Sequence, residues 1–309
     1  MERYNNFNIL VIGDFMLDKY LEGKPTKVSQ EAPVLVVKHT GERSILGGAG
    51  NVVNNLISLG AKVYAAGVIG KDLEGQQLKE LLQFSDVNVD CIVEETTMPT
   101  ISKTRIVAKG QHLIRYDIEG EEKVSQETGT LLNKRIIGLV ERVKIDAIIV
   151  ADYDKYVVTN SLMDCLRQTK RPIFINGKPE NADTYSSCEI LVLNDFEYIE
   201  SLRKLELKNA TELIQKLSCS AILHTRGDQG IILHQINNEK LFLANKVTEV
   251  DPTGASDTVI SVFVLEYLRR YNIIEAIELA NKAASIIVTK FGTNPITMSE
   301  LKDSFRKEE

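Results

Sequence analysis

The stretch Asn8-Ile9-Leu10-Val11-Ile12-Gly13 decides the fold class of this chain. Its four central residues are aliphatic and mostly β-branched, and no polar residue alternates with them. Such a run is typical of a parallel strand that is buried on both faces of its sheet. Comparable runs span Lys62–Val68, Ala147–Val150, Pro172–Ile175, Glu189–Leu193 and Ala221–Thr225.

Segments with helical periodicity lie between most of these runs. They span Ala49–Leu59, Leu73–Phe84, Ser125–Val143, Thr159–Thr169 and Ala210–Leu217. Because strands that alternate with helices form parallel sheets, we predict an α/β fold with a central, mostly parallel sheet and helices on both of its faces. Beyond residue 254 the alternation stops, and we expect three helices at Ala255–Tyr271, Ile274–Lys290 and Thr297–Arg306.

Two stretches depart from this alternation. Lys24–His39 combines short β-prone pieces with two prolines, and Thr100–Asp117 contains two strand-like runs joined at Lys109-Gly110. They predict a small antiparallel β-strand lid, formed by about residues 19–40 and 99–118. We find no internal repeat and no long linker, so we expect residues 1–309 to form a single domain that carries this lid.

Charge and composition exclude several classes of protein. With 37 basic and 43 acidic residues the net charge is −6, which gives no general attraction to nucleic acid or an anionic membrane. The longest apolar runs are far shorter than the ~20 residues that span a bilayer. The N-terminus lacks the pattern of a signal peptide, so we expect a cytoplasmic protein. The four cysteines and four histidines show no metal-ligand spacing, which argues against a zinc enzyme.

The octapeptide Asp251-Pro252-Thr253-Gly254-Ala255-Ser256-Asp257-Thr258 stands at the start of a long apolar helix. The first backbone N–H groups of a helix have no intrahelical partner and lie at the positive end of its dipole. Gly254 to Asp257 are therefore suited to hold the charge of a phosphoryl group in transfer, with Asp257 as a proton acceptor. A simpler interpretation is that Thr253 or Asp257 only caps the helix.

Three other clusters follow predicted strands or open predicted helices. Gly47-Gly48-Ala49-Gly50-Asn51 lets a ligand approach the backbone closely, although it also suits tight packing or a turn. Asn194-Asp195-Phe196-Glu197 follows a buried strand, where α/β proteins bind ligands, and equally resembles an ordinary helix start. Thr225–Gly230 follows another strand and suits a ligand loop or a hairpin turn. No P-loop or dinucleotide-binding motif is present.

The order of the motifs GDxMLD, GGxxN, NxxE, TxGxxG and DxTGAxD resembles that of the ribokinase-like, or PfkB, carbohydrate kinases over essentially the whole chain. The segments Gly13–Tyr20, Ser29–Val34 and Gln111–Asp117 resemble the branch that phosphorylates D-glycero-D-manno-heptose 7-phosphate. In many bacteria that kinase is fused to a nucleotidyltransferase. Because this chain contains no HxGH motif, we expect the kinase part alone.

The resemblance implies ATP as phosphoryl donor, Mg²⁺ as metal and a role for each matching residue. Asp257 would be the general base, and the amides around Gly254, Ala255 and Ser256 would form an anion hole for the γ-phosphoryl group. Asn194 and Glu197 would organise Mg²⁺ through water. The residues expected along the nucleotide are Lys178, Asn194, Asp195, Phe196, Glu197, Thr225, Arg226, Gly227, Gly230 and Asn281.

The resemblance also implies which residues face the sugar. Those expected at its hydroxyl groups are Asp14, Asp18, Gly47, Gly48 and Asn51. Those expected at its remote phosphate are Lys103, Arg105, Lys109 and Arg115, all from the lid. The alternative for these four cations is a solvated strand face.

Two departures from the family pattern bear on this prediction. Ser256 stands where the family usually has glycine; in the first turn of a helix φ is negative, so serine is tolerated there. Asn176 stands where the heptose kinases usually have aspartate, which removes one acidic group near the nucleotide, whereas Lys178 is retained.

Three functions are therefore considered. The first is ATP-dependent phosphorylation of the anomeric hydroxyl of D-glycero-D-manno-heptose 7-phosphate, which gives the 1,7-bisphosphate, a precursor of ADP-heptose. The second is the same chemistry on another sugar or sugar phosphate. The third is a degenerate, non-catalytic protein that binds sugar or nucleotide, against which the retention of Asp257, Asn194 and Glu197 argues. An open edge of the lid is compatible with a homodimer formed lid to lid.

Overall fold

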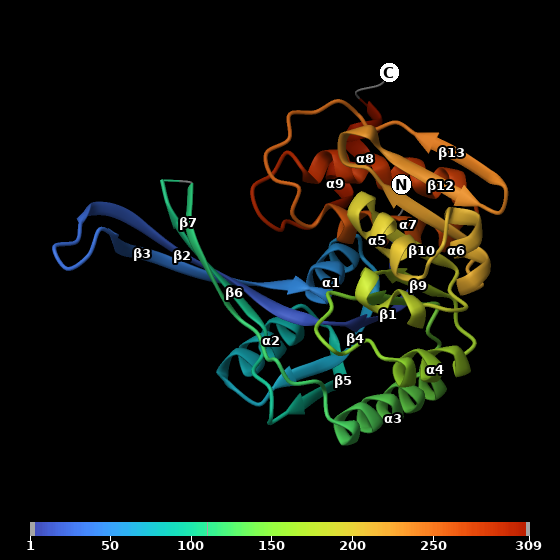
Figure 1. Ribbon diagram of the computed structural model, residues 1–309, viewed down its shortest axis with the longest axis horizontal. Coiled ribbons are helices and arrows are strands. Elements are labelled where there is room, and N and C mark those ends of the chain that lie inside the picture. Colours follow the sequence, from blue (N-terminus) through green and yellow to red (C-terminus); the bar gives the residue numbers. More distant parts are fainter. Residues whose placement is uncertain (1–3, 110, 307–309) are drawn as a thin grey trace.

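The computed structural model describes residues 4–109 and 111–306. Within these residues, nine strands form one central sheet (Figure 1). In spatial order they are β13 (Asn238–Phe242), β12 (Ile231–Gln235), β11 (Ala221–Thr225), β10 (Ile190–Asn194), β9 (Ile173–Asn176), β8 (Ala147–Ala151), β1 (Asn8–Gly13), β4 (Lys62–Gly70) and β5 (Asn88–Glu95). The strands from β5 to β11 in this order pair in parallel, and β12 and β13 pair antiparallel.

Strand β1 lies inside this sheet, paired in parallel with β4 and β8, as its apolar run predicts. Its alternate residues enter two different cores. Ile9 and Val11 pack in one core, and Leu10 and Ile12 pack in the other. All four are fully buried, which is why the run contains no polar residue.

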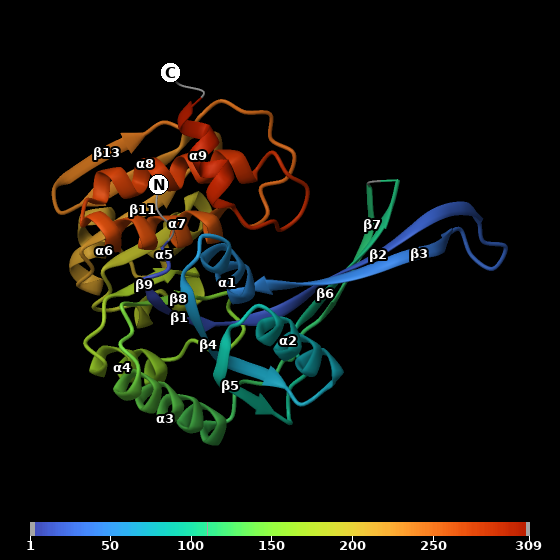
Figure 2. The same ribbon diagram turned by 180° about the vertical axis from the view of Figure 1, so that it is seen from behind.

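Helices cover both faces of the sheet, as predicted (Figures 1 and 2). The helices that contribute to the core on one face are α1 (Ala49–Ser58), α2 (Leu73–Phe84), α7 (Ala255–Arg270), α8 (Ile273–Ile287) and α9 (Met298–Arg306). Those on the other face are α3 (Gln126–Arg142), α4 (Asn160–Gln168), α5 (Asp195–Lys204) and α6 (Ala210–Leu217). Two short 3₁₀ helices span Pro179–Thr184 and Gly227–Gln229.

A second sheet projects from this body (Figures 1 and 2). Its strands, in spatial order, are β3 (Leu35–Gly48), β2 (Phe15–Val28), β6 (Ser102–Ala108) and β7 (Gln111–Ile118). The predicted turn at Lys109-Gly110 lies partly outside the described residues, because these exclude Gly110.

The prediction of a small, purely antiparallel lid is wrong in two respects. Strands β2 and β3 are longer than expected, since they reach the body of the protein at Phe15 and Gly48. In addition, β2 pairs with β6 in parallel. The reason is the direction of the strands that precede them: β2 follows β1 and β6 follows β5, and β1 and β5 run parallel within the central sheet.

Parallel strands end at a common edge of their sheet, and the predicted motifs follow β1, β9, β10 and β11 at that edge. The start of α7 lies against α1, which follows the second sheet. None of the helices in residues 4–109 and 111–306 has the length and apolar character needed to cross a membrane.

Candidate active site

Helix α7 begins at Ala255, and Gly254 is its N-terminal cap. Gly254 has φ 82°, in the left-handed region that favours glycine, and a Cβ atom there would lie 2.6 Å from Nδ2 of Asn51. Glycine therefore permits both the entry into the helix and the close approach of Asn51. Ser256 is in the first turn of α7 and has no positive φ, as predicted for a tolerated serine.

The carboxyl group of Asp257 is buried and accepts hydrogen bonds from three side chains. Nδ2 of Asn51 lies 2.8 Å from Oδ2, and Nδ2 of Asn176 lies 3.1 Å from Oδ1. The hydroxyl of Tyr153 also donates to Oδ1. Burial raises the pKa of Asp257 to about 6, although these bonds and the charge of Lys178 act in the opposite direction. A carboxylate with a pKa near neutrality suits a general base.

A cavity of about 540 Å³ opens beside the first turn of α7. It brings together seven of the residues predicted from the sequence: Asn194, Thr225, Gly227, Gly230, Ala255, Ser256 and Asn281. Residues 244–247 and 249, after β13, supply another part of its wall. The sequence analysis did not find that segment, since it carries no motif and no periodicity.

Asn194 and Glu197 form a capping box at the start of α5. The side chain of Asn194 accepts from the N–H of Glu197 at 2.9 Å, and Oε2 of Glu197 accepts from the N–H of Asn194 at 2.8 Å. Oε1 of the buried Glu197 pairs with the ammonium group of Lys178. The helix-start interpretation of this motif is therefore correct. This finding does not decide the metal role of Asn194 and Glu197, because a capping box can also organise water around a metal ion.

The donor set at this edge fits Mg²⁺ held mainly by water and phosphate. Mg²⁺ keeps several waters and takes one or two carboxylates together with substrate phosphates. Glu197 supplies such a carboxylate close to Asn194, which lines the cavity. Within the described ranges, no group of three or more His, Cys, Asp or Glu side chains could hold a metal by itself.

The other residues predicted along the nucleotide do not line this cavity. Asp195 accepts from Nε2 of His224 at 2.7 Å and from Nε of Arg226 at 3.1 Å. Phe196 is 66% exposed. The structure thus places Asp195 and Arg226 against each other beside the cavity.

The residues predicted at the sugar hydroxyl groups surround the junction of β1, β2 and α1. Asp14 is fully buried and accepts from the backbone N–H groups of Tyr153, Lys155 and Val157, so it fixes the loop after β8. Burial, reinforced by Asp152, raises the pKa of Asp14 to about 7.

Asp18 lies against the backbone of Gly47 and pairs with Arg105. A Cβ atom at Gly47 would lie 2.4 Å from Oδ2 of Asp18, and one at Gly48 would lie 2.4 Å from the carbonyl oxygen of Asp14. The two glycines therefore allow β3 to pass close to the carboxylate of Asp18 and to the backbone of Asp14.

The second sheet carries a row of cations on one face. Arg43 of β3, Tyr20 of β2, Arg105 of β6 and Arg115 of β7 stand opposite one another across the four strands. The guanidinium carbons of Arg43 and Arg105 lie 4.2 and 5.4 Å from the centre of the Tyr20 ring. Arg43 was not predicted from the sequence.

The two predicted lysines lie near this row. Lys103 precedes Arg105 by two positions and so shares its face, and its Nζ lies 3.8 Å from Oε1 of Glu119. Lys109 lies in the turn after β6 with φ 51°. The structure therefore gathers Lys103, Arg105 and Arg115 on one face and places Lys109 at the tip of the same hairpin.

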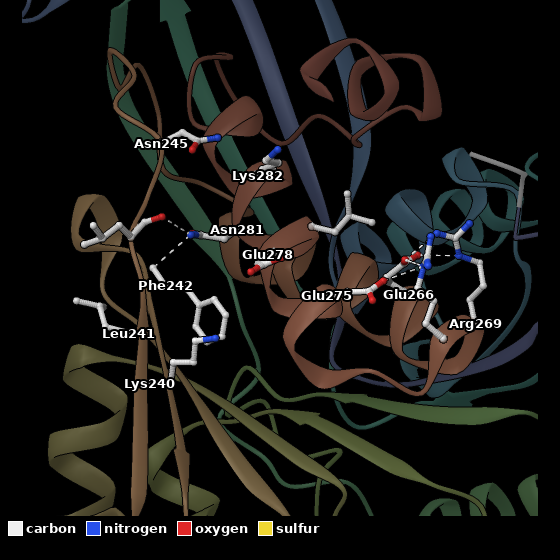
Figure 3. Close-up of a pocket in the computed structure, with 13 residues that line it drawn as sticks. Lys240, Leu241, Phe242, Asn245, Glu266, Arg269, Glu275, Glu278, Asn281 and Lys282 are labelled. Atoms are coloured by element: carbon white, nitrogen blue, oxygen red, sulfur yellow. Dashed lines mark hydrogen bonds and ion pairs between the residues drawn. The ribbon is translucent and has the colours of Figure 1, made fainter. Parts of the chain in front are cut away.

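A second cavity, of about 640 Å³, lies between β13, α7 and α8 (Figure 3). Of the predicted site residues it contains Asn281, whose Nδ2 donates to the carbonyl oxygen of Leu243 at 2.8 Å. Glu266, in its wall, pairs with Arg269 and Arg270. Because the cavity at the start of α7 contains seven of the predicted site residues and this one contains Asn281 alone, the cavity at the start of α7 remains the candidate active site.

Solved structures of several kinases share this fold. Phosphofructokinase-2 from Escherichia coli in complex with potassium superposes with a TM-score of 0.79 at 16% identity and covers 99% of each chain. Ribokinase from Thermotoga maritima gives a TM-score of 0.72 at 19% identity, over 97% of this chain and 99% of the other. The chain therefore has the predicted ribokinase-like fold.

Curated relatives are more similar in sequence. The bifunctional protein HldE of Sulfurimonas denitrificans is 36% identical over 96% of this chain and 63% of its own length. HldE of Marinomonas sp. is 37% identical over 96% of this chain and 64% of its own length. The chain thus spans just under two thirds of these relatives. The model of the pfkB family of carbohydrate kinases matches residues 6–300, so the chain belongs to that family and is a phosphotransferase that acts on a sugar hydroxyl.

Proposed function

We propose that this protein transfers the γ-phosphoryl group of ATP to the anomeric hydroxyl of D-glycero-D-manno-heptose 7-phosphate and so forms the 1,7-bisphosphate. The observation that carries the proposal is the position of Asp257. It is buried in the first turn of α7 and accepts a hydrogen bond from Asn51, which lies on the side of the second sheet. Two neighbours in the same turn, Ala255 and Ser256, line the cavity of about 540 Å³.

In the proposed mechanism the sugar hydroxyl gives its proton to the carboxylate of Asp257 as its oxygen bonds to the γ-phosphorus. The bond between that phosphorus and the β–γ bridging oxygen breaks, and ADP leaves. The amides of Ala255 and Ser256, at the positive end of α7, stabilise the charge on the transferring group. Bound Mg²⁺ supplies further neutralisation of phosphate charge.

The ATP site is proposed to be the 540 Å³ cavity, with Thr225, Gly227, Gly230 and Asn281 along the nucleotide. Lys178 and Glu197 would stand at the phosphate end. Their ion pair is partly buried and follows β9 and β10 at the carboxyl edge of the sheet. A lysine at this place can pair with phosphate oxygens once the nucleotide is bound.

The face that carries Arg43, Arg105 and Arg115 is proposed to bind the 7-phosphate. Guanidinium groups bind phosphate oxygens in pairs and with defined geometry. Arg105 is also tied to Asp18, at the base of the sheet, so that phosphate and sugar sites would be continuous. In this proposal the second sheet acts as a lid over the sugar.

A kinase assay over a panel of sugars tests the proposal. The panel contains heptose 7-phosphate, the heptose without phosphate, and fructose, ribose and mannose with their phosphates. We expect the highest kcat/KM for heptose 7-phosphate and a large loss without its phosphate. Preference for another sugar phosphate would support the second function and reject the first. Nucleotide binding with no turnover on any sugar would favour the degenerate protein.

We also propose that two chains associate lid to lid. Strand β7 is an edge strand, and its Leu113, Ile114 and Tyr116 are exposed. An exposed, partly apolar edge strand is a template for pairing with a second chain. Sedimentation equilibrium tests this: the wild type should be a dimer and Ile114→Lys a monomer, whereas Ile199→Lys, which changes an exposed isoleucine on α5, should not alter the mass.

A further inference from the structure

We propose that Asn176 and Tyr153 are positioning residues that keep Asp257 ionised and leave its Oδ2 atom as the proton acceptor. The inference rests on the function proposed above, and it concerns groups that act on the base and not on the substrate. Asn176 is the departure from the heptose kinase pattern noted in the sequence, and Tyr153 was assigned no role there.

The two oxygens of Asp257 differ in their partners. Oδ1 accepts from the hydroxyl of Tyr153 and from Nδ2 of Asn176. Oδ2 accepts from Nδ2 of Asn51, and the described part of the chain supplies it with no second donor. Because each carboxylate oxygen accepts about two hydrogen bonds, the remaining acceptor position of Asp257 is on Oδ2.

The surroundings of Asn51 also indicate that a ligand binds on the Oδ2 side of Asp257. Asn51 is 2% exposed, and its Oδ1 atom has no hydrogen-bond partner within residues 4–109 and 111–306. A buried amide oxygen without a partner is costly, and a hydroxyl donor from a bound molecule would satisfy it. This oxygen belongs to the same amide that donates to Oδ2 of Asp257.

The charges around Asp257 explain why a neutral side-chain amide at position 176 helps to keep Asp257 ionised. Lys178 favours the ionised carboxylate of Asp257, whereas Tyr153 also lies near the carboxylates of Glu197 and Asp14. Burial and Asp257 raise the pKa of Tyr153 far above its usual value, so its hydroxyl stays a donor. The Asn176 amide donates without adding charge. An aspartate there would place two carboxylates about 3 Å apart, and such pairs share one proton.

The pH dependence of kcat/KM tests the inference. For Asn176→Asp we expect the midpoint of the acidic limb to move upward by about one pH unit or more, since the pair must lose its shared proton before Asp257 can act as a base. Asn176→Ala and Tyr153→Phe each remove one donor and should move the midpoint upward by less. Unchanged midpoints in all three variants would overturn the inference.

Matched controls separate this effect from simple loss of stability. Asn88→Asp makes the same change in β5 beside an aspartate, Asp90, whose hydrogen bond with Asn88 is exposed. Tyr4→Phe removes a hydroxyl that donates to another buried carboxylate, Glu266, which lies toward the opposite end of α7 from Asp257. Neither control should move the midpoint. A shift of equal size in a control would also overturn the inference.

A second measurement does not depend on the sugar. Carbon-13 NMR of labelled aspartate carboxyl groups gives the pKa of Asp257 directly, with its resonance assigned by its loss in Asp257→Asn. We expect the pKa to rise in Asn176→Asp even if no sugar on the panel is phosphorylated. Failure of the proposed function would thus appear in the panel assay, and failure of this inference in the titration.

Discussion

Asn194 and Glu197 hold each other through two reciprocal hydrogen bonds at the start of α5, and Lys178 pairs with the remaining oxygen of Glu197. Both carboxylate oxygens of Glu197 are therefore engaged before any metal or nucleotide binds. The arrangement fixes the acidic group at the carboxyl edge of the sheet, where it can orient water around Mg²⁺. It also means that a substitution at Glu197 changes the helix cap as well as the metal site.

Glu197→Gln should raise the Mg²⁺ concentration needed for half-maximal rate, because a neutral amide attracts metal-bound water less strongly. A metal titration of the steady-state rate measures this. Glu300→Gln is a close control. Glu300 also accepts from the backbone N–H of the residue before its helix, Thr297 before α9, and it also pairs with a lysine, Lys290. An unchanged titration for Glu197→Gln would assign Glu197 to the helix cap alone.

Asp257→Asn should lower kcat by about a hundredfold or more, because the amide cannot accept the hydroxyl proton and general bases typically contribute ~10²–10⁴-fold. Nucleotide affinity should stay close to that of the wild type, since Asp257 does not line the cavity at the start of α7. Turnover assays and calorimetric titration with ATP measure the two effects. A variant that keeps more than about a tenth of the wild-type turnover would remove Asp257 from the mechanism.

The wild-type enzyme should lose activity as the pH falls through about 6, because the pKa of Asp257 is raised by burial to about 6 and the protonated carboxyl cannot act as a base. Above that pH the base is ionised and the limb should be flat. A profile of kcat/KM between pH 5 and pH 8 measures this. A profile that stays flat down to pH 5 would show that the pKa of Asp257 lies closer to the usual value for aspartate, about 3.9, and that the buried carboxylate is better stabilised than the structure indicates.

The strands and helices of the body were predictable because their signals are local. Ile9 to Ile12 form an uninterrupted apolar run, and a strand between two parallel neighbours needs such a run. The lid strands were harder, since Pro25 suggested a break in β2. Beyond Gly23, β2 pairs with β3 alone among the described strands, so a residue without an N–H is tolerated on its open side.

The surroundings of Asp257 were not predictable in the same way. The motif that contains Asp257 is contiguous, and it indicated a phosphate site at a helix start. Asn51, Tyr153 and Asn176 come from three other segments, and only the order of strands in the sheet brings them to one carboxylate. For the same reason Arg43 was missed, because its place beside Arg105 and Arg115 depends on the register of four strands.

Arg43→Gln and Arg115→Gln should each raise the KM for the phosphorylated sugar by about tenfold, since a bond between charged groups contributes roughly 1.5 kcal/mol. The kcat should change little, because neither side chain reaches the reacting oxygen in the proposed geometry. Arg203→Gln, which removes an exposed arginine from α5, is the matched control. If the KM for the sugar without its phosphate rose equally, the row of cations would not be the phosphate site.

The last prediction concerns Ser256, which stands where the family usually has glycine. Ser256 lies in the first turn of α7 and lines the cavity, so its amide points out of the helix start as a glycine amide would. Ser256→Gly should therefore change turnover by less than about tenfold, or ~1.4 kcal/mol in the barrier. If the side chain instead obstructed the γ-phosphoryl group, the same substitution would raise a very low rate by orders of magnitude. Turnover at saturating ATP distinguishes the two outcomes, and the second would favour a degenerate kinase over the active enzyme proposed for this chain.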